Sequence, residues 1–214
     1  MDWTQTFDGY CERTDPSYWS EPVNAITNAA FMLVAIFMWR RSSGQLPAQY
    51  LSGVLFLIGA GSYLFHTHAT AWASLVDVLP IAVFALSYIY LANMDFMEWG
   101  RVRSAAGMLG YLPFSAGVLY VLDAIPFFNI SAVYWPLVLM IAGYGLWFRS
   151  RRPGLGNGLL IGAAILTVSL TFRSLDEIVC GAFPLGTHFL WHILNAIMLG
   201  WMVEGWLRYG TKPR

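Results

Sequence analysis

Seven apolar runs, each about as long as a lipid bilayer is thick, dominate this chain. A membrane-spanning helix needs about 20 mainly apolar residues. Short polar or turn-rich segments, such as RRSSGQLP and RSRRPG, separate the runs. We therefore predict an all-α fold and a polytopic membrane protein, built as a bundle of seven transmembrane helices. The runs cover residues 23–39, 48–66, 72–94, 104–122, 130–148, 154–172 and 186–203.

The composition is typical of a membrane protein. Of the 214 residues, 57% are hydrophobic and 11% are charged, and the mean hydropathy is +0.56, whereas soluble domains carry roughly a quarter charged residues. The formal net charge of +0 argues against nucleic acid as a partner, because no basic field would attract phosphates. We expect one membrane domain, 1–214, in a bacterial inner membrane or a eukaryotic endomembrane. It comprises an acidic outer segment (1–22), the helix bundle (23–203) and a basic cytoplasmic tail (204–214).

The basic residues predict the orientation of the bundle. If the N-terminus lies outside, ten of the twelve Lys and Arg residues fall on the cytoplasmic side, as the positive-inside rule requires. Only Arg13 and Arg173 would lie outside. Because six or eight spans would not give this alternation, it supports seven spans, an outer or lumenal N-terminus and a cytoplasmic C-terminus. The ten residues are Arg40, Arg41, Arg101, Arg103, Arg149, Arg151, Arg152, Arg208, Lys212 and Arg214.

A few polar side chains within the runs are expected to meet at one depth. His188 and His192 are four residues apart, as are Ser62 and His66, so each pair lies on one face of a helix. Asp77 lies near the start of the third run. In the predicted topology the second run ends outside, and the third and seventh begin there. All five side chains therefore fall in the outer half of the bundle, where ionisable residues are candidates for function.

Three imidazoles at one depth suit zinc. Neutral histidine nitrogen ligates zinc, and a catalytic zinc site has three protein ligands and one open position. We predict that His66, His188 and His192 bind a catalytic zinc ion. Asp77 would then transfer protons, and Ser62 would donate a hydrogen bond to the developing oxyanion. The alternative is an interhelical hydrogen-bond network without a metal.

The N-terminal segment offers hard oxygen ligands on the same outer side. Asp8, Glu12, Asp15 and Glu21 lie within a short stretch, and calcium takes six to eight oxygen ligands. Their spacing fits no EF-hand loop. The residues alone therefore leave two interpretations, a calcium site and a solvated acidic loop.

Both cysteines of the chain are also predicted to lie outside, where a disulfide persists. Cys11 lies in the N-terminal segment, and Cys180 lies in the connection before the seventh run. This leaves open a disulfide that ties the segment over the bundle, or two buried free thiols. His68, just past the end of the second run, is expected to be an exposed loop residue.

Together these motifs resemble the alkaline ceramidases of the CREST superfamily of membrane hydrolases. The motifs are YCER…WSEPVNAITNAAF, GSYLFH, Asp77 eleven residues after His66, and HFLWH, and they keep the family's order from Cys11 to His192. The resemblance implies a seven-helix intramembrane zinc amidohydrolase. Such an enzyme hydrolyses the amide bond of ceramide to a sphingoid base and a fatty acid.

The resemblance assigns roles to the residues of the predicted zinc site. The family's zinc histidines correspond to His66, His188 and His192. Its catalytic serine and aspartate correspond to Ser62 and Asp77.

The resemblance also implies a calcium site and a disulfide between Cys11 and Cys180. Thr14 stands where the family has an asparagine, and the spacing from there to Glu21 is shorter than in the family. The positions that correspond to the family's calcium ligands are Asp8, Tyr10 (through its carbonyl), Glu12, Thr14 and Glu21.

Two other functions remain open. One is a lipid esterase or phospholipase of the same superfamily, and the other is a zinc-containing seven-helix lipid receptor without turnover. The predicted outer N-terminus argues against a receptor of the adiponectin-receptor type, because resemblance to that group would imply the opposite orientation in the membrane. A retinal pump is excluded because the only lysine, Lys212, lies in the tail and cannot supply a Schiff base. The expected partner is a membrane lipid, ceramide-like, with no obligate protein partner.

Overall fold

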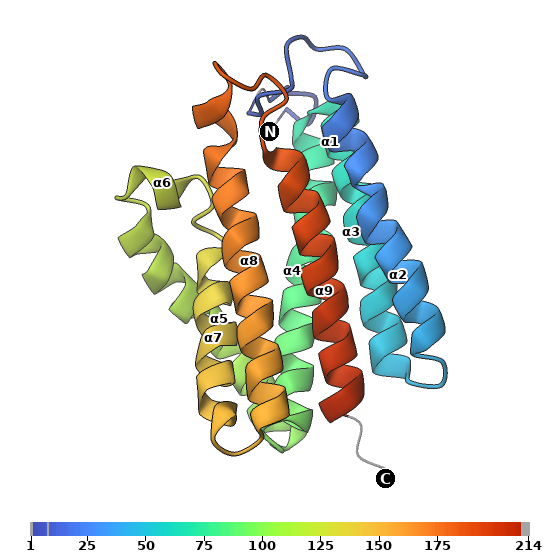
Figure 1. Cartoon of the computed structure of the whole chain (residues 1–214), viewed down its shortest axis with the longest axis vertical. Helices are drawn as coiled ribbons and strands as arrows, with labels where there is room; N and C mark the ends of the chain where they lie inside the picture. The colour runs from blue at the N-terminus through green and yellow to red at the C-terminus, as the bar shows by residue number, and fades with distance from the viewer. Residues whose placement is uncertain (1, 8, 211–214) are drawn as a thin grey trace.

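Figure 1 shows a computed structural model in which long helices run side by side as a bundle. The structure describes residues 2–7 and 9–210. These residues form helices and one isolated bridge between Thr6 and Thr70, so the all-α prediction is confirmed. The helices are α1 (Pro22–Thr27), α2 (Ala29–Arg41), α3 (Leu46–His68), α4 (Ala71–Asp95), α5 (Arg101–Leu122), α6 (Pro126–Asn129), α7 (Trp135–Arg149), α8 (Pro153–Val179) and α9 (His188–Tyr209).

Within the described residues, five helical segments are long and apolar enough to cross a membrane. In Figure 1, α7 and α9 run alongside these segments and cover the fifth and seventh predicted runs. The count of seven spans and the outer N-terminus stay predictions. The five segments are Pro22–Arg41, Leu46–His68, Ala71–Asp95, Arg101–Leu122 and Pro153–Val179.

The predicted connection between the sixth and seventh runs is wrong in extent, because α8 continues to Val179. Polar side chains near the end of α8 form hydrogen bonds with neighbouring segments while their backbone stays helical. Arg173 donates a hydrogen bond to the carbonyl of Ile130, and Asp176 accepts hydrogen bonds from the start of α9. Because both charged side chains have hydrogen-bond partners, the helix continues through them.

The centre of the bundle is a close-packed apolar core. Helix α3 packs against α2, α4 and α9, and α8 packs between α7 and α9. Phe31, Leu51, Leu55, Leu170 and Val203 are fully buried in this core. Helix α5 lies at the edge, against α4 and α7, and buries only Ser104 among its residues. Its apolar outer face is of the kind that faces lipid.

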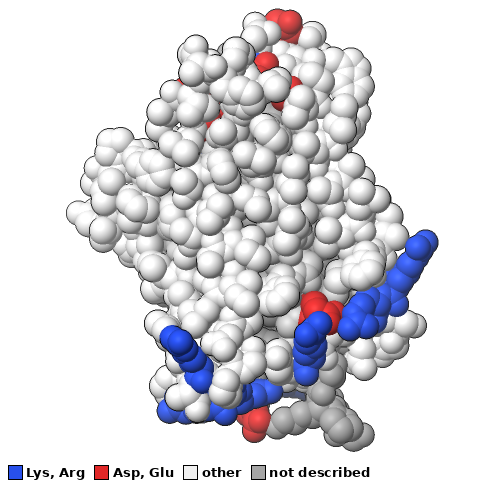
Figure 2. All heavy atoms as spheres, viewed as in Figure 1, with Lys and Arg blue, Asp and Glu red and all other residues white. Residues whose placement is uncertain are grey.

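The charged side chains lie at the two ends of the bundle on the face shown in Figure 2. Lys and Arg gather at the lower end, where α2 and α9 finish. There Arg41 and Arg208 both pair with Glu204, at 3.0 and 2.7 Å. The middle band of this face carries no charged side chain, as expected for a surface in contact with hydrocarbon.

The N-terminal segment folds over the end of the bundle where α9 begins (Figure 1). The backbone N–H of Phe7 donates a hydrogen bond to the carbonyl of Ala69, just after α3. Further along, a disulfide joins Cys11 to Cys180, the residue directly after α8. The segment is therefore fixed directly above the ends of α3, α8 and α9.

Candidate metal centre

Three histidine rings meet under the N-terminal segment. The ring centroids of His66 and His188 are 5.1 Å apart, those of His66 and His192 are 4.8 Å apart, and those of His188 and His192 are 4.6 Å apart. One ring nitrogen of each lies within 4.8 Å of the others, and all three side chains are buried. Among the described residues, this is the one group of three or more His, Cys, Asp or Glu side chains arranged closely enough to hold a metal ion. The three rings could therefore hold one metal ion.

The positions of these rings are set by the end of α3 and the start of α9. His66 lies in the last turn of α3, whereas His188 and His192 occupy successive turns at the start of α9. Thr187 precedes α9 without capping it through its side chain. Instead the Asp176 carboxylate accepts hydrogen bonds from the backbone N–H groups of Thr187 and His188, at 2.6 and 2.8 Å. A carboxylate at a helix N-terminus satisfies free donors and the helix dipole, so Asp176 fixes the start of α9.

Hydrogen bonds from outside the cluster orient two of the rings. Nδ1 of His66 lies 2.6 Å from Oε2 of Glu21, and Nδ1 of His192 lies 2.9 Å from Oγ1 of Thr27. Burial alone would raise the pKa of Glu21, but hydrogen bonds from His66 and Arg13 lower it below its usual value. Metal-bound histidines commonly have such partners, which fix the ring and its tautomer.

The unpaired ring nitrogens show that a metal fits this cluster. Nε2 of His192 and Nδ1 of His188 are buried and have no hydrogen-bond partner among the described residues. A buried polar atom left without a partner costs about 1–3 kcal/mol. A metal ion would satisfy such nitrogens, because neutral imidazole nitrogen is a preferred ligand of zinc and of other first-row metals.

The structure places Ser62 and Asp77 beside the cluster. Ser62 is one turn before His66 on α3 and is fully buried, and Asp77 on α4 interacts electrostatically with His66. The two helices touch here, since a Cβ on Gly61 would lie 2.3 Å from the carbonyl oxygen of Val76. Within the described part of the chain, Oγ of Ser62 and Oδ1 of Asp77 have no hydrogen-bond partner. Both atoms remain available to a bound molecule.

A cavity of about 410 Å³ opens beside the histidines. The ring of Tyr10 lies over His188, with centroids 3.9 Å apart. Burial raises the pKa of Tyr10 above its usual value, so its phenol is a hydrogen-bond donor at neutral pH. Side chains that line the cavity include Tyr10, Asp77, Tyr134, Arg173, His188 and Trp191. The wall of this cavity thus contains both Asp77 of α4 and His188 of the histidine cluster.

The sequence of this chain matches a known protein family. The family model described as Ceramidase matches residues 6–212, nearly the whole chain. This chain belongs to the ceramidase family. No curated protein matches it. Membership of the ceramidase family implies a hydrolase that acts on the amide bond of a lipid substrate, ceramide, and the matched residues include the whole histidine cluster.

Of the residues that the resemblance assigns to a calcium site, Tyr10, Glu12 and Glu21 have oxygens that already accept hydrogen bonds. Both carboxylate oxygens of Glu12 accept backbone N–H groups at the start of α1, at 2.7 and 2.8 Å. The Tyr10 carbonyl accepts the N–H of Arg13 at 3.1 Å, and both carboxylate oxygens of Glu21 are hydrogen-bonded. Thr14 is exposed. Asp8 lies outside the described residues, as do Lys212 and Arg214 of the tail.

Other predicted residues lie apart from the cluster. Asp15 is exposed and accepts a hydrogen bond from the N–H of Ser17 at 2.7 Å. His68 is exposed, as predicted, although it is the last residue of α3 and not a loop residue. Cys11 and Cys180 are bonded to each other, with Cα atoms 5.4 Å apart.

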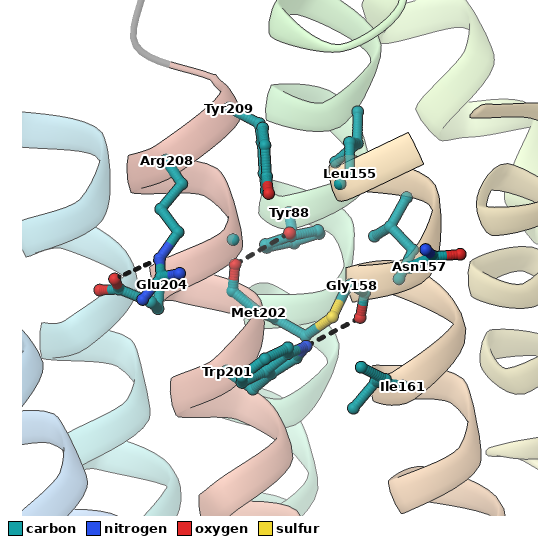
Figure 3. Close-up of a pocket in the computed structure, with 13 residues that line it drawn as sticks. Tyr88, Leu155, Asn157, Gly158, Ile161, Trp201, Met202, Glu204, Arg208 and Tyr209 are labelled. Atoms are coloured by element: carbon teal, nitrogen blue, oxygen red, sulfur yellow. Dashed lines mark hydrogen bonds and ion pairs between the residues drawn. The ribbon is translucent and has the colours of Figure 1, made fainter. Parts of the chain in front are cut away.

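A second cavity, of about 170 Å³, lies at the opposite end of α9 and is shown in Figure 3. Three of its polar side chains are paired within the cavity wall: Trp201 donates to the carbonyl of Gly158, Tyr88 to that of Met202, and Arg208 to Glu204. None of the described residues that line it is a histidine, cysteine or aspartate. This cavity therefore offers no group for the chemistry of the histidine cluster.

The sequence did not predict three contributors to the centre. Asp176, Thr27 and Arg13 act through backbone or long-range contacts, which leave no periodic pattern in a sequence. A signal did exist for Asp176, since a carboxylate among apolar residues at the end of a run requires a buried partner.

Proposed function

We propose that this ceramidase-family chain is an intramembrane zinc-dependent amidohydrolase. It would hydrolyse the amide bond of ceramide-like N-acyl lipids to a sphingoid base and a fatty acid. The observation that carries this proposal is the buried triad of histidines, with unpaired nitrogens, next to unpaired Ser62 and Asp77. Three histidines match a catalytic zinc site with one open position. Bound zinc would polarise the substrate carbonyl and activate water.

The chain's own residues supply the proton transfers and the orientation. Asp77 faces the cavity and has a free carboxylate oxygen, so it acts as general base and then as general acid toward the leaving amine. Ser62 is fully buried with a free hydroxyl, which donates a hydrogen bond to the oxyanion that forms at the amide carbon. Glu21 and Thr27 hold two of the histidine rings during the reaction.

The lipid would enter from the bilayer and lie with its amide in the outer cavity. A smaller apolar cavity of about 70 Å³ lies deeper in the bundle and shares Tyr134 and Trp191 with the outer cavity. An acyl chain that follows this path would displace apolar side chains between α4, α7 and α9. The proposal includes seven spans, formed by α1–α2, α3, α4, α5, α7, α8 and α9, with the N-terminal segment on the outer or lumenal side.

The test combines metal analysis with turnover on purified protein in lipid nanodiscs. The wild-type protein should contain one zinc per chain and cleave a fluorescent N-acyl sphingoid base. His188→Ala should lose both the metal and the cleavage. His68→Ala is the matched control, because this exposed histidine lies outside the cluster and should retain both properties.

The same assay can contradict the proposal. Wild-type protein without stoichiometric zinc, or His188→Ala with normal turnover, would exclude this mechanism. A matched substrate in which an ester replaces the amide tests the bond preference. Faster cleavage of the ester than of the amide would identify a lipid esterase instead.

A further inference from the structure

Arg13 is a buried cation next to the metal centre. Its Nε donates a hydrogen bond to Oε1 of Glu21 at 2.5 Å, and the exposed fractions of the two side chains are 4% and 2%. Its two Nη groups donate to the carbonyls of Asp15 and His66, at 3.2 and 2.9 Å. A buried guanidinium is tolerated only when its charge and its donors are satisfied, and both conditions hold here.

Glu21 connects this guanidinium to the metal centre. One carboxylate oxygen accepts Arg13, and the other accepts Nδ1 of His66 and the side-chain amide of Asn24. Arg13 also reaches the backbone of His66 directly. The guanidinium therefore contacts both the Glu21 carboxylate, which orients the His66 ring, and the end of α3, which carries His66.

The surroundings of Arg13 do not fit a calcium ion. Calcium takes six to eight oxygens, but the oxygens of Glu12 and Glu21 already accept hydrogen bonds from N–H donors. The carbonyls of Tyr10 and Asp15 accept hydrogen bonds from Arg13 itself. A divalent cation placed among these oxygens would also be repelled by the guanidinium at short range.

We propose that Arg13 is the permanent cation of the N-terminal segment and that this chain functions without calcium. Its guanidinium takes the place that the family resemblance gives to a calcium ion and keeps Glu21 against His66. Arg13 is thus a positioning residue that acts on zinc affinity through Glu21. The inference rests on the proposed function only for the identity of the metal at the histidines.

The first experiment measures calcium and needs no variant. Purified wild-type protein is dialysed to equilibrium against radioactive calcium at up to about 1 mM, the range of weak extracellular calcium modules. We expect no stoichiometric uptake, and we expect turnover in calcium-depleted buffer to be unchanged when calcium is added. Uptake of one calcium per chain, or turnover that depends on added calcium, would overturn the proposal.

The second experiment measures zinc affinity by competition with a chelator. Arg13→Met keeps an unbranched apolar side chain that reaches about as far as Nε but removes the charge and the donors, and should weaken zinc binding about 10–100-fold, as expected when a ligand loses its orienting partner. Arg13→Lys should restore part of that loss. Arg103→Met is the matched control, because Arg103 lies in α5 and stacks on Trp99. The zinc affinity of the Arg103→Met variant should equal that of the wild type.

A double-variant cycle separates positioning from a general structural role. If Arg13 acts through Glu21, Arg13→Met should weaken zinc binding less than threefold in the Glu21→Gln background. An equal loss in both backgrounds, or a loss below threefold in wild type, would overturn the proposal. Wild-type protein that binds no zinc would instead contradict the proposed function, while the calcium measurement would still test Arg13.

Discussion

The backbone N–H of His188, the first residue of α9, donates a 2.8 Å hydrogen bond to Oδ1 of Asp176 in α8. The backbone N–H of Thr187, the residue before α9, donates to the same oxygen at 2.6 Å. The other carboxylate oxygen accepts the backbone N–H of Cys11 at 2.9 Å. One buried carboxylate therefore ties α8, α9 and the N-terminal segment together. Gly186 permits this approach, because its φ is +63° and a Cβ there would lie 2.1 Å from Oδ1 of Asp176.

Asp176→Ala should destabilise the protein and loosen the metal centre. The substitution leaves three backbone donors without their acceptor, and loss of hydrogen bonds to a charged group costs about 1.5–3 kcal/mol each in favourable cases. Because the three losses are not additive, we expect about 3 kcal/mol in total. Thermal unfolding in detergent measures the effect. Glu177→Ala is the control, because it removes the same charge from an exposed neighbour, and an equal loss in both variants would contradict the capping role.

Gly61→Ala should force α3 and α4 apart beside the site. The added methyl group would lie 2.3 Å from the carbonyl oxygen of Val76 and 3.2 Å from Cα of Asp77. Backbone atoms cannot rotate away as a side chain can, so we expect a loss of about 1–3 kcal/mol together with lower turnover. Gly53→Ala is the control on the same helix, since its Cβ would meet only Trp39 at an ordinary 3.6 Å. Equal unfolding temperatures for the two variants would contradict the close approach.

Thr27→Val should weaken metal binding with little change in shape. Valine keeps the volume of threonine but removes the hydroxyl that contacts Nδ1 of His192. Loss of such a partner typically costs 10–100-fold in metal affinity, which chelator competition measures. In the control, Thr167→Val, the lost hydroxyl only contacts the carbonyl of Ala163 in its own helix. A normal metal affinity in Thr27→Val would show that this contact does not orient the ring.

Helical periodicity explains why the clustering of the three histidines could be predicted from the sequence. His188 and His192 lie one turn apart, and so do Ser62 and His66, because four residues are about one turn in any α-helix. The alternation of long apolar runs then places the ends of α3 and α9 at one side of the bundle. Neither inference depends on the details of packing.

The contacts around the histidines could not be predicted in the same way. Glu21 was expected only as a calcium ligand, but it contacts His66 and Arg13 because the irregular N-terminal segment folds back over α3. Such a segment has no repeat from which side-chain directions follow. The end of α8 was also misplaced, because Asp176 reads as a loop residue until its partners on α9 are known.

Asp77→Asn should strongly reduce turnover and leave the metal content unchanged. The carboxylate is outside the histidine cluster, so the amide should not alter metal content, but an amide cannot act as a general base. Loss of general acid–base catalysis costs typically 10²–10⁴-fold in rate. Turnover and zinc content are measured on the same sample. Asp123→Asn, an exposed position after α5, is the control, and turnover within tenfold of wild type in Asp77→Asn would assign the base elsewhere.

Ser62→Ala should lower turnover without lowering stability. The buried hydroxyl makes no hydrogen bond of good geometry among the described residues and has only a weak contact with the Asp77 carboxylate, so its removal takes away little stabilisation. If the hydroxyl donates to the oxyanion, turnover should fall about 10²–10³-fold, as for the loss of one oxyanion donor. Ser52→Ala is the matched control on the same helix, since that hydroxyl contacts the carbonyl of Ala48. A variant that keeps its unfolding temperature but loses turnover would support the catalytic role of Ser62, whereas one that unfolds at a lower temperature with normal turnover would show Ser62 to be structural.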